Sequence, residues 1–166
     1  MSLLVRAADA GDAAAITAIH NEGVADRVAT FRAKPRPVAD VKAAIGSGRP
    51  LLVAERDGTV VGWAGIGPYD DANDWYAGIG EATVYVARSE RRSGSASALL
   101  DALEAAAATD GRHKLIAKIF DTNEASLRLF ERAGYATVGT HRRHGRLAGE
   151  WKDVVVLEKL LGEAGV

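Results

Sequence analysis

The sequence predicts an α/β protein built on a mixed central sheet. Two apolar runs, residues 51–55 and 59–64, flank Asp57-Gly58, and Asp-Gly between such runs is a strong signal for a tight antiparallel hairpin. Further along the chain, short apolar runs typical of strands alternate with alanine- and leucine-rich stretches typical of helices. Strands that first form hairpins and then alternate with helices indicate a mixed sheet covered by helices.

Apolar spacing and turn residues predict the elements of the N-terminal half. Val5 begins a short strand, and Asp12 is expected to cap a helix whose apolar residues keep near-helical spacing. Two prolines make residues 29–37 a loop, because proline cannot continue a helix. A second short helix should then end at the glycine-flanked residues 46–48.

The second half alternates strands and helices after an irregular, polar stretch at residues 67–80. Strands are expected at residues 81–87, 114–120, 135–140 and 151–158, and helices at residues 97–109 and 125–133.

Composition excludes several functional classes. The 166 residues suit one domain spanning residues 1–166, large enough for a core without metals or disulfides. A formal net charge of −1 gives no electrostatic reason to expect nucleic acid as a partner. There is no cysteine, and the four histidines lack the short spacings of a metal site, so no metal is expected.

The same sequence favours a cytoplasmic location. The first residues contain neither a basic leader nor a long apolar run, so they do not resemble a signal peptide. No segment approaches the roughly 18 apolar residues that suggest a membrane span. We therefore expect no membrane partner.

Residues 83–100 carry the most chemical information. They combine a strand, a short basic turn and the start of a helix, and the turn places Arg91 and Arg92 beside small residues. Small residues let a phosphate approach the main chain, where the free N–H groups and the dipole of a helix start bind anions. The alternative is an ordinary surface turn with solvated arginines. The turn has neither the Gly-Lys-Ser/Thr of a Walker loop nor the three glycines of a dinucleotide fingerprint.

Two motifs carry a family resemblance. The turn reads Arg-x-x-Gly-x-Ala from Arg91 to Ala96, and Asn-x-x-Ser-x-x-Leu begins at Asn123 and is followed by Gly134-Tyr135. The chain therefore resembles the GCN5-related N-acetyltransferase (GNAT) superfamily. Further short matches make it similar to the phosphinothricin and arsinothricin N-acetyltransferase branch. They lie at residues 29–31, 62–64, 68–69, 76–81, 119–120 and 149–154.

This resemblance implies a fold, a cosubstrate and a binding surface. The fold is a mixed, mostly antiparallel twisted sheet, splayed between the strands that begin at Glu81 and Lys114 and flanked by about four helices. The cosubstrate is acetyl-CoA, and the branch tends to form homodimers. The implied cofactor-binding residues are Val84, Tyr85, Val86, Arg91, Arg92, Ser93, Gly94, Ser95, Ala96, Asn123 and Ser126. Asn123 is equally well placed to cap the following helix.

Glu81 is the candidate general base for a small-molecule amine acceptor. It stands at the start of the cofactor-facing strand, in a stretch with few other carboxylates, and it matches the glutamate of the family's Tyr-x-Gly-x-x-Glu pattern. A carboxylate can attract an ammonium group and help to remove its proton. The alternative is an exposed or ion-paired glutamate with a structural role.

The acid that protonates the leaving thiolate is not identified by sequence. Many superfamily members use a tyrosine just after the leucine of the second motif, where this chain has Phe130. Tyr85, His141 and a bound water remain as alternatives. A second departure is Arg92, where the family usually has glycine, and this restricts the backbone of the turn.

The expected acceptor-binding residues are mainly aromatic: Thr30, Phe31, Tyr69, Trp75 and Trp151. Where relatives usually carry arginine or lysine suited to an oxyanion, this chain has the acidic residues 70–74. We therefore expect an acceptor with a neutral side chain. The basic residues 141–146 are the candidates to bind the carboxylate of this acceptor. The alternative is that they form a solvated hairpin tip.

The first reading that the resemblance implies is an acetyl-CoA-dependent N-acetyltransferase acting on the primary amine of a small amino acid or amino-acid analogue. Two other functions remain open at this point. Phe130, Arg92 and the acidic residues 70–74 allow a catalytically weak module that binds acyl-CoA as a sensor or regulatory subunit. Acetylation of protein N-termini or lysines is the third reading, disfavoured because the aromatic loops suit a small acceptor.

Overall fold

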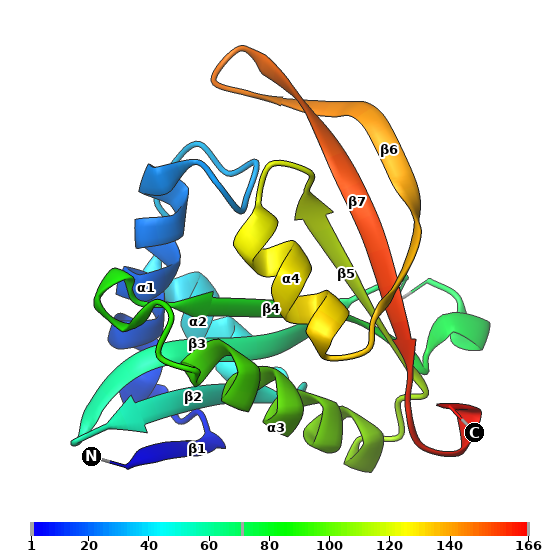
Figure 1. The fold of residues 1–166 in the computed structure, drawn as a ribbon. Coiled ribbons are helices and arrows are strands. Elements are labelled where there is room, and N and C mark those ends of the chain that lie inside the picture. Colours follow the sequence, from blue (N-terminus) through cyan, green and yellow to red (C-terminus); the bar gives the residue numbers. More distant parts are fainter. Residues whose placement is uncertain (1, 71, 166) are drawn as a thin grey trace.

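The computed structural model describes residues 2–70 and 72–165 and contains a seven-stranded sheet with helices on both faces (Figure 1). The strands are β1 (Leu3–Ala7), β2 (Leu51–Arg56), β3 (Thr59–Pro68), β4 (Ile79–Val86), β5 (Lys114–Phe120), β6 (Ala136–Leu147) and β7 (Glu150–Leu160). The α-helices are α1 (Ala13–Asp26), α2 (Val38–Gly46), α3 (Ser95–Thr109) and α4 (Glu124–Arg132). Short 3₁₀ turns lie at η1 (Ala10–Asp12), η2 (Asp74–Tyr76), η3 (Arg88–Glu90) and η4 (Gly162–Gly165).

The sheet has the order β1-β2-β3-β4-β5-β7-β6. All neighbouring strands are antiparallel except β4 and β5, which are parallel. Asp57 and Gly58 both have positive φ, 51° and 78°, as the predicted tight hairpin between β2 and β3 requires. The predicted mixed, mostly antiparallel sheet with four flanking helices is confirmed.

The sheet opens in its middle. β4 and β5 pair over three residues only, from Ile79 opposite Lys114 to Glu81 opposite Ile116. Beyond Glu81 the two strands diverge, and Figure 1 shows β5 and β7 rising away from β4. Among the described residues, the edge of β4 that faces β5 therefore has no strand partner after Glu81. The predicted splay lies at the expected place.

Helices cover the two faces of the sheet and bury two separate cores. Leu99, Leu100 and Leu103 of α3 are fully buried against β2 to β5 on one face. On the other face, Ile16 of α1 and Val41 of α2 pack against Val53 and Trp63 of the sheet. Side chains that alternate along a strand point to opposite faces, so β4 contributes side chains to both layers.

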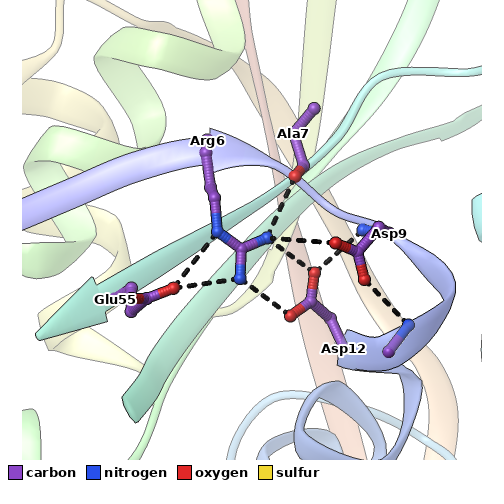
Figure 2. A network of polar contacts seen from close by, with 6 residues as sticks. Arg6, Ala7, Asp9, Asp12 and Glu55 are labelled. Atoms are coloured by element: carbon purple, nitrogen blue, oxygen red, sulfur yellow. Dashed lines mark hydrogen bonds and ion pairs between the residues drawn. The ribbon is translucent and has the colours of Figure 1, made fainter. Parts of the chain in front are cut away.

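The predicted capping role of Asp12 is wrong, although its position is right. Asp12 immediately precedes α1, but its side chain makes no capping bond to that helix. Its carboxylate instead accepts hydrogen bonds from the guanidinium of Arg6 (2.8 and 3.0 Å) and from the backbone N–H of Asp9 (2.8 Å). Arg6 also binds Glu55 of β2, so the Arg6 guanidinium ties β1, β2 and the start of α1 together (Figure 2).

The expected position of the basic residues 141–146 between the last two strands is also wrong. The structure includes them in β6, which runs on to Leu147, and the turn to β7 is at Ala148-Gly149. The register between β6 and β7 shifts between His141 and Gly145, which accommodates the extra residues as a bulge. Within residues 2–70 and 72–165, no helix is long and apolar enough to span a membrane.

Candidate active site

A cavity of about 270 Å³ lies where β4 and β5 diverge. Its described lining residues are His20, Ala29, Thr30, Arg36, Trp63, Glu81, Ala82, Thr83, Val84, Tyr85, Lys118, Ile119, Phe120, Asn123, Ser126 and Phe130. Consecutive side chains of β4 point to opposite faces of the sheet, and all residues from Glu81 to Val84 line this cavity. The cavity therefore passes through the sheet, from the side of α4 to the side of α1.

Glu81 lies at the last residue pair that joins β4 to β5. Its carboxylate is 3.6 Å from the ammonium group of Lys118, and both side chains remain partly exposed. A partly exposed ion pair contributes at most about 1 kcal/mol to stability. The contact with Lys118 is therefore a weak structural reason for a glutamate at position 81. The arrangement leaves a carboxylate in the cavity wall, available to an incoming cation.

Tyr85 and His20 form an aromatic wall on the α1 side. Tyr85 stacks on Trp63 with ring centroids 5.2 Å apart, and His20 lies 4.9 Å from the Tyr85 ring. Burial lowers the pKa of His20 to about 4 and raises the pKa of Tyr85 to about 12. At neutral pH the wall is therefore uncharged, with a neutral imidazole and a protonated phenol.

Of the two side chains proposed as acid for the thiolate, only Tyr85 lines this cavity. His141 lies in β6 and stacks on His144, with ring centroids 4.4 Å apart. Phe130 is buried in the cavity wall and packs edge-on against Tyr135. Phe130, which stands where many superfamily members have a tyrosine, thus has a packing role.

The turn at residues 91–96 joins η3 to α3 and has an unusual backbone. Arg92 and Gly94 have positive φ, 64° and 86°. Arg92 thus adopts a left-handed conformation that glycine enters more readily, which accounts for the usual glycine of relatives at this position. The N–H groups of Ala96 and Ser97 lie in the first turn of α3, where a helix supplies no acceptor.

Asp26, at the end of α1, holds the basic side of this turn. Its carboxylate accepts hydrogen bonds from the guanidinium groups of Arg88 (2.6 Å) and Arg91 (2.7 Å). Bonding to Arg88 and then to Arg91 lowers the pKa of Asp26 to about 2. The turn is thereby attached to the helix that carries His20.

The predicted cofactor-facing residues occupy the other side of the opening. Val84 lines the cavity, and the edge of β4 through Val86 is free of β5. Asn123 and Ser126 line it from α4, and the predicted cap is present, because the side-chain oxygen of Asn123 accepts from the N–H of Ser126 (3.3 Å).

The predicted acceptor-binding residues are only partly brought together. Thr30 lines the cavity, and Phe31 packs edge-on against the cavity residue Phe120. Three aromatic side chains lie elsewhere: Tyr69 and Trp75 contact Tyr76, and Trp151 lies under the guanidinium of Arg146.

The acidic residues 70–74 do not line the cavity either, as far as they are described. Asp70 binds within its own loop, to the N–H of Ala72 and the side chain of Asn73. Asp71 lies outside the described residues.

Sequence reasoning missed four polar or aromatic cavity residues: His20, Arg36, Trp63 and Lys118. Each lies on an element or loop that was expected, and Trp63 falls within the short family match at residues 62–64, but none was proposed as a site residue. Strand pairing could have indicated two of them. Lys118 is on the strand paired with β4, and Trp63 lies opposite Tyr85 in the β3–β4 ladder. His20 and Arg36 come from outside the sheet and had no such signal.

Comparison with known proteins agrees with this geometry. The sequence profile of the Acetyltransferase (GNAT) family matches residues 17–135. The chain is 35% identical over 156 residues to a phosphinothricin N-acetyltransferase of Streptomyces viridochromogenes, covering 90% of this chain and 83% of that protein. It is 32% identical over 168 residues to an L-methionine sulfoximine/L-methionine sulfone acetyltransferase of Pseudomonas aeruginosa, covering 95% and 94%.

Solved structures agree as well. An acetyltransferase of Salmonella typhimurium, solved with its cofactor acetyl-CoA, superposes with a TM-score of 0.93 at 29% identity, covering 98% of this chain and 96% of that one. A phosphinothricin acetyltransferase of Sinorhizobium meliloti in complex with acetyl-CoA gives 0.91 at 28% identity, covering 98% and 90%. The resemblance inferred from the motifs is confirmed: the chain belongs to the acetyltransferase (GNAT) family.

Proposed function

We propose that this protein transfers the acetyl group of acetyl-CoA to the primary amine of a small amino acid or amino-acid analogue. The observation that carries this proposal is the cavity that crosses the sheet beside Glu81. The named relatives acetylate phosphinothricin or methionine sulfoximine, which are amino-acid analogues. Because these relatives are enzymes and Glu81 lines the cavity, a non-catalytic acyl-CoA sensor is not favoured.

The α4 side of the opening suits the donor. The free edge of β4 at residues 84–86 offers backbone N–H and C=O groups to the amides of pantetheine, as an added strand would. The turn at residues 91–96 would hold the diphosphate with the first-turn N–H groups of α3 and the charge of Arg91 and Arg92. Asn123 and Ser126 would contact the pantetheine from α4.

The α1 side suits the amine. Glu81 attracts the ammonium group of the acceptor and takes a proton from it, and the free amine then attacks the thioester carbonyl carbon. A C–N bond forms and the C–S bond breaks, so the acetyl group moves directly between the two bound substrates. The products are the N-acetyl compound and CoA, with one net proton released to solvent.

The acceptor has a neutral side chain. In the described part of the loop at residues 70–74, no cation is present to bind a phosphinate or arsinate group. Release of thiol from acetyl-CoA, screened over free amino acids, L-methionine sulfone, L-methionine sulfoximine, phosphinothricin and peptides, tests this choice. Phosphinothricin as the best acceptor by about tenfold would contradict it.

The replacement Glu81→Gln tests the catalytic role. It is nearly isosteric and removes the proton-accepting charge, so kcat should fall about a hundredfold or more, while the Kd of acetyl-CoA stays within about twofold. Steady-state kinetics and titration calorimetry measure the two quantities. Lys118→Met, which removes the partner of Glu81 and keeps the carboxylate, serves as control and should reduce kcat far less. An unchanged kcat and pH–rate profile in Glu81→Gln would leave Glu81 with a structural role only.

The same proposal includes one catalytic domain over residues 1–166, a cytoplasmic location and a homodimer. The exposed outer strand β6 supports the dimer, because its side chains from Ala136 to His144 are all exposed in the single chain.

A further inference from the structure

Arg36 lies where two cavities meet. It lines the cavity at the opening of the sheet and also a second cavity of about 190 Å³ between α2 and β3. The two cavities share Trp63 and Thr83 as well. Thr83 and Glu81 are alternate residues of β4, so their side chains lie on one face, about 7 Å apart. Arg36 therefore belongs to the α1 side, where the acceptor binds.

The backbone of Arg36 is held in place by α1. Its N–H donates to the side-chain oxygen of Asn21 (2.7 Å), and the side-chain amide of Asn21 donates to the carbonyl of Arg36 (3.2 Å). This paired contact anchors an otherwise irregular loop at one residue. The guanidinium is thus presented to the cavity from a fixed point.

The charge of Arg36 has no local counter-ion in the described part of the chain. Asp40, whose charge favours the Arg36 cation, is ion-paired with Arg32 (3.9 Å). Burial, and then the charge of Arg32, lower the pKa of Arg36. A partly buried guanidinium without a partner is unfavourable until an anion reaches it, and its planar fork matches a carboxylate.

The other cations near the acceptor are less well placed for its carboxylate. Arg49 lines only the second cavity. Lys118 lies 3.6 Å from Glu81, so a carboxylate bound to Lys118 would face the charge of the proposed general base. Arg146, in the basic residues 141–146 that the sequence favoured for this purpose, stacks on Trp151 with 4.3 Å between the guanidinium carbon and the ring centroid. None of residues 141–146 lines either cavity.

We propose that the guanidinium of Arg36 binds the α-carboxylate of the acceptor and so selects amino acids over simple amines. This inference rests on the proposed acetyltransfer to an amino acid. With the carboxylate on Arg36, the ammonium group is directed toward Glu81, and the acceptor side chain can enter the apolar cavity lined by Val41 and Leu51. Arg36 then supplies the binding of an acceptor anion that the acidic loop at residues 70–74 does not provide.

The test compares an acid with its amide. L-Methionine sulfone and L-methionine sulfone amide differ at the carboxylate and share the amine and the side chain. In Arg36→Ala, KM for the acid should rise about tenfold or more, because a charge-assisted pair is lost, while KM for the amide changes less than about twofold. Arg36→Lys should recover part of the loss, since it keeps the charge without the fork. Lys34→Ala, at an exposed cation that lines neither cavity, should leave both values unchanged.

Titration calorimetry of L-methionine sulfone on the wild-type protein and on Arg36→Ala measures the same contact without turnover. Circular dichroism and Tm verify that the variants are folded. Equal effects on acid and amide, or acid binding that does not change in Arg36→Ala, would overturn the role of Arg36. A wild-type protein that binds the acid through Arg36 but acetylates no amine would overturn the proposed function and leave this contact standing.

Discussion

Asp12 illustrates how a buried carboxylate can support an arginine that joins segments distant in sequence. Its side chain is nearly buried and binds both terminal nitrogens of the Arg6 guanidinium, which also holds Glu55 of β2 (Figure 2). These bonds, those of Arg6 first, lower the pKa of Asp12. A lowered pKa means that the ionised form is the one stabilised by folding.

We expect Asp12→Asn to reduce the free energy of unfolding at pH 7 by about 1–3 kcal/mol, the usual cost of breaking a buried charged contact. The contribution of Asp12 is present above its unfolded pKa of 3.8 and is lost as the pH falls below that value. Urea unfolding from pH 7 to pH 2.5 should therefore show the two proteins converging in stability at low pH. Asp9→Asn, at a residue 75% exposed and 4.0 Å from Arg6, is the control and should cost much less. A constant difference across this pH range would contradict the assignment.

Residue chemistry was predicted from the sequence where a motif spans a few neighbouring positions. Asn123 caps α4, as the Asn before Glu-Ala-Ser indicated. Which aromatic side chains line the cavity was less predictable, because Tyr69 and Trp75 are close to β4 in sequence but contact Tyr76 and do not line the cavity. Asp12 was assigned to a local cap because the sequence gives no sign of Arg6 as a competing partner.

At the scale of elements, α1 approaches β4 unusually closely. Gly23 faces the ring of Tyr85, and a Cβ at this position would lie 2.6 Å from the nearest ring carbon. The ring cannot easily move, because Trp63 and His20 pack against it. The glycine at position 23 therefore allows α1 to lie close to the aromatic wall of the cavity.

We expect Gly23→Ala to destabilise the protein by about 1–3 kcal/mol through overpacking, despite the better helix propensity of alanine. In a Tyr85→Ala background the same change should be neutral or stabilising. Gly46→Ala at the end of α2 is the matched control, because a Cβ there meets nothing within 4 Å. Thermal unfolding of the wild-type protein, the three single variants and the double variant measures these effects. Equal destabilisation in both backgrounds would show that contact with Tyr85 is not the cause.

Most elements could be predicted because periodicity and turn residues are local signals. The β2–β3 hairpin follows from Asp57-Gly58, and β5 has the predicted bounds. The length of β6 could not be predicted, because its basic residues 141–146 resemble a solvated turn and only pairing with β7 makes them a strand. Arg36 was overlooked for the same reason: its place depends on a long-range contact with Asn21.

At the scale of the whole molecule, the sheet ends in an exposed strand. β6 has only β7 as a partner, and Val138 on it is 61% exposed. Unprotected edge strands and exposed apolar side chains favour association with another chain. This is the surface on which we place the homodimer.

Light scattering after size-exclusion chromatography should therefore give twice the 17.4 kDa mass of one chain. Val138→Lys should shift the population toward monomer, since a charge would have to be buried at the interface. Val28→Lys, at another exposed valine outside β6, should not do so. A monomeric wild-type protein at micromolar concentration would contradict the dimer.

Because the cavity passes through the sheet where β4 and β5 diverge, the proposed function has donor and acceptor enter from opposite faces of the molecule. In that arrangement neither bound substrate blocks the entrance of the other. We therefore expect no compulsory order of substrate addition, as a consequence of the divergence of two strands.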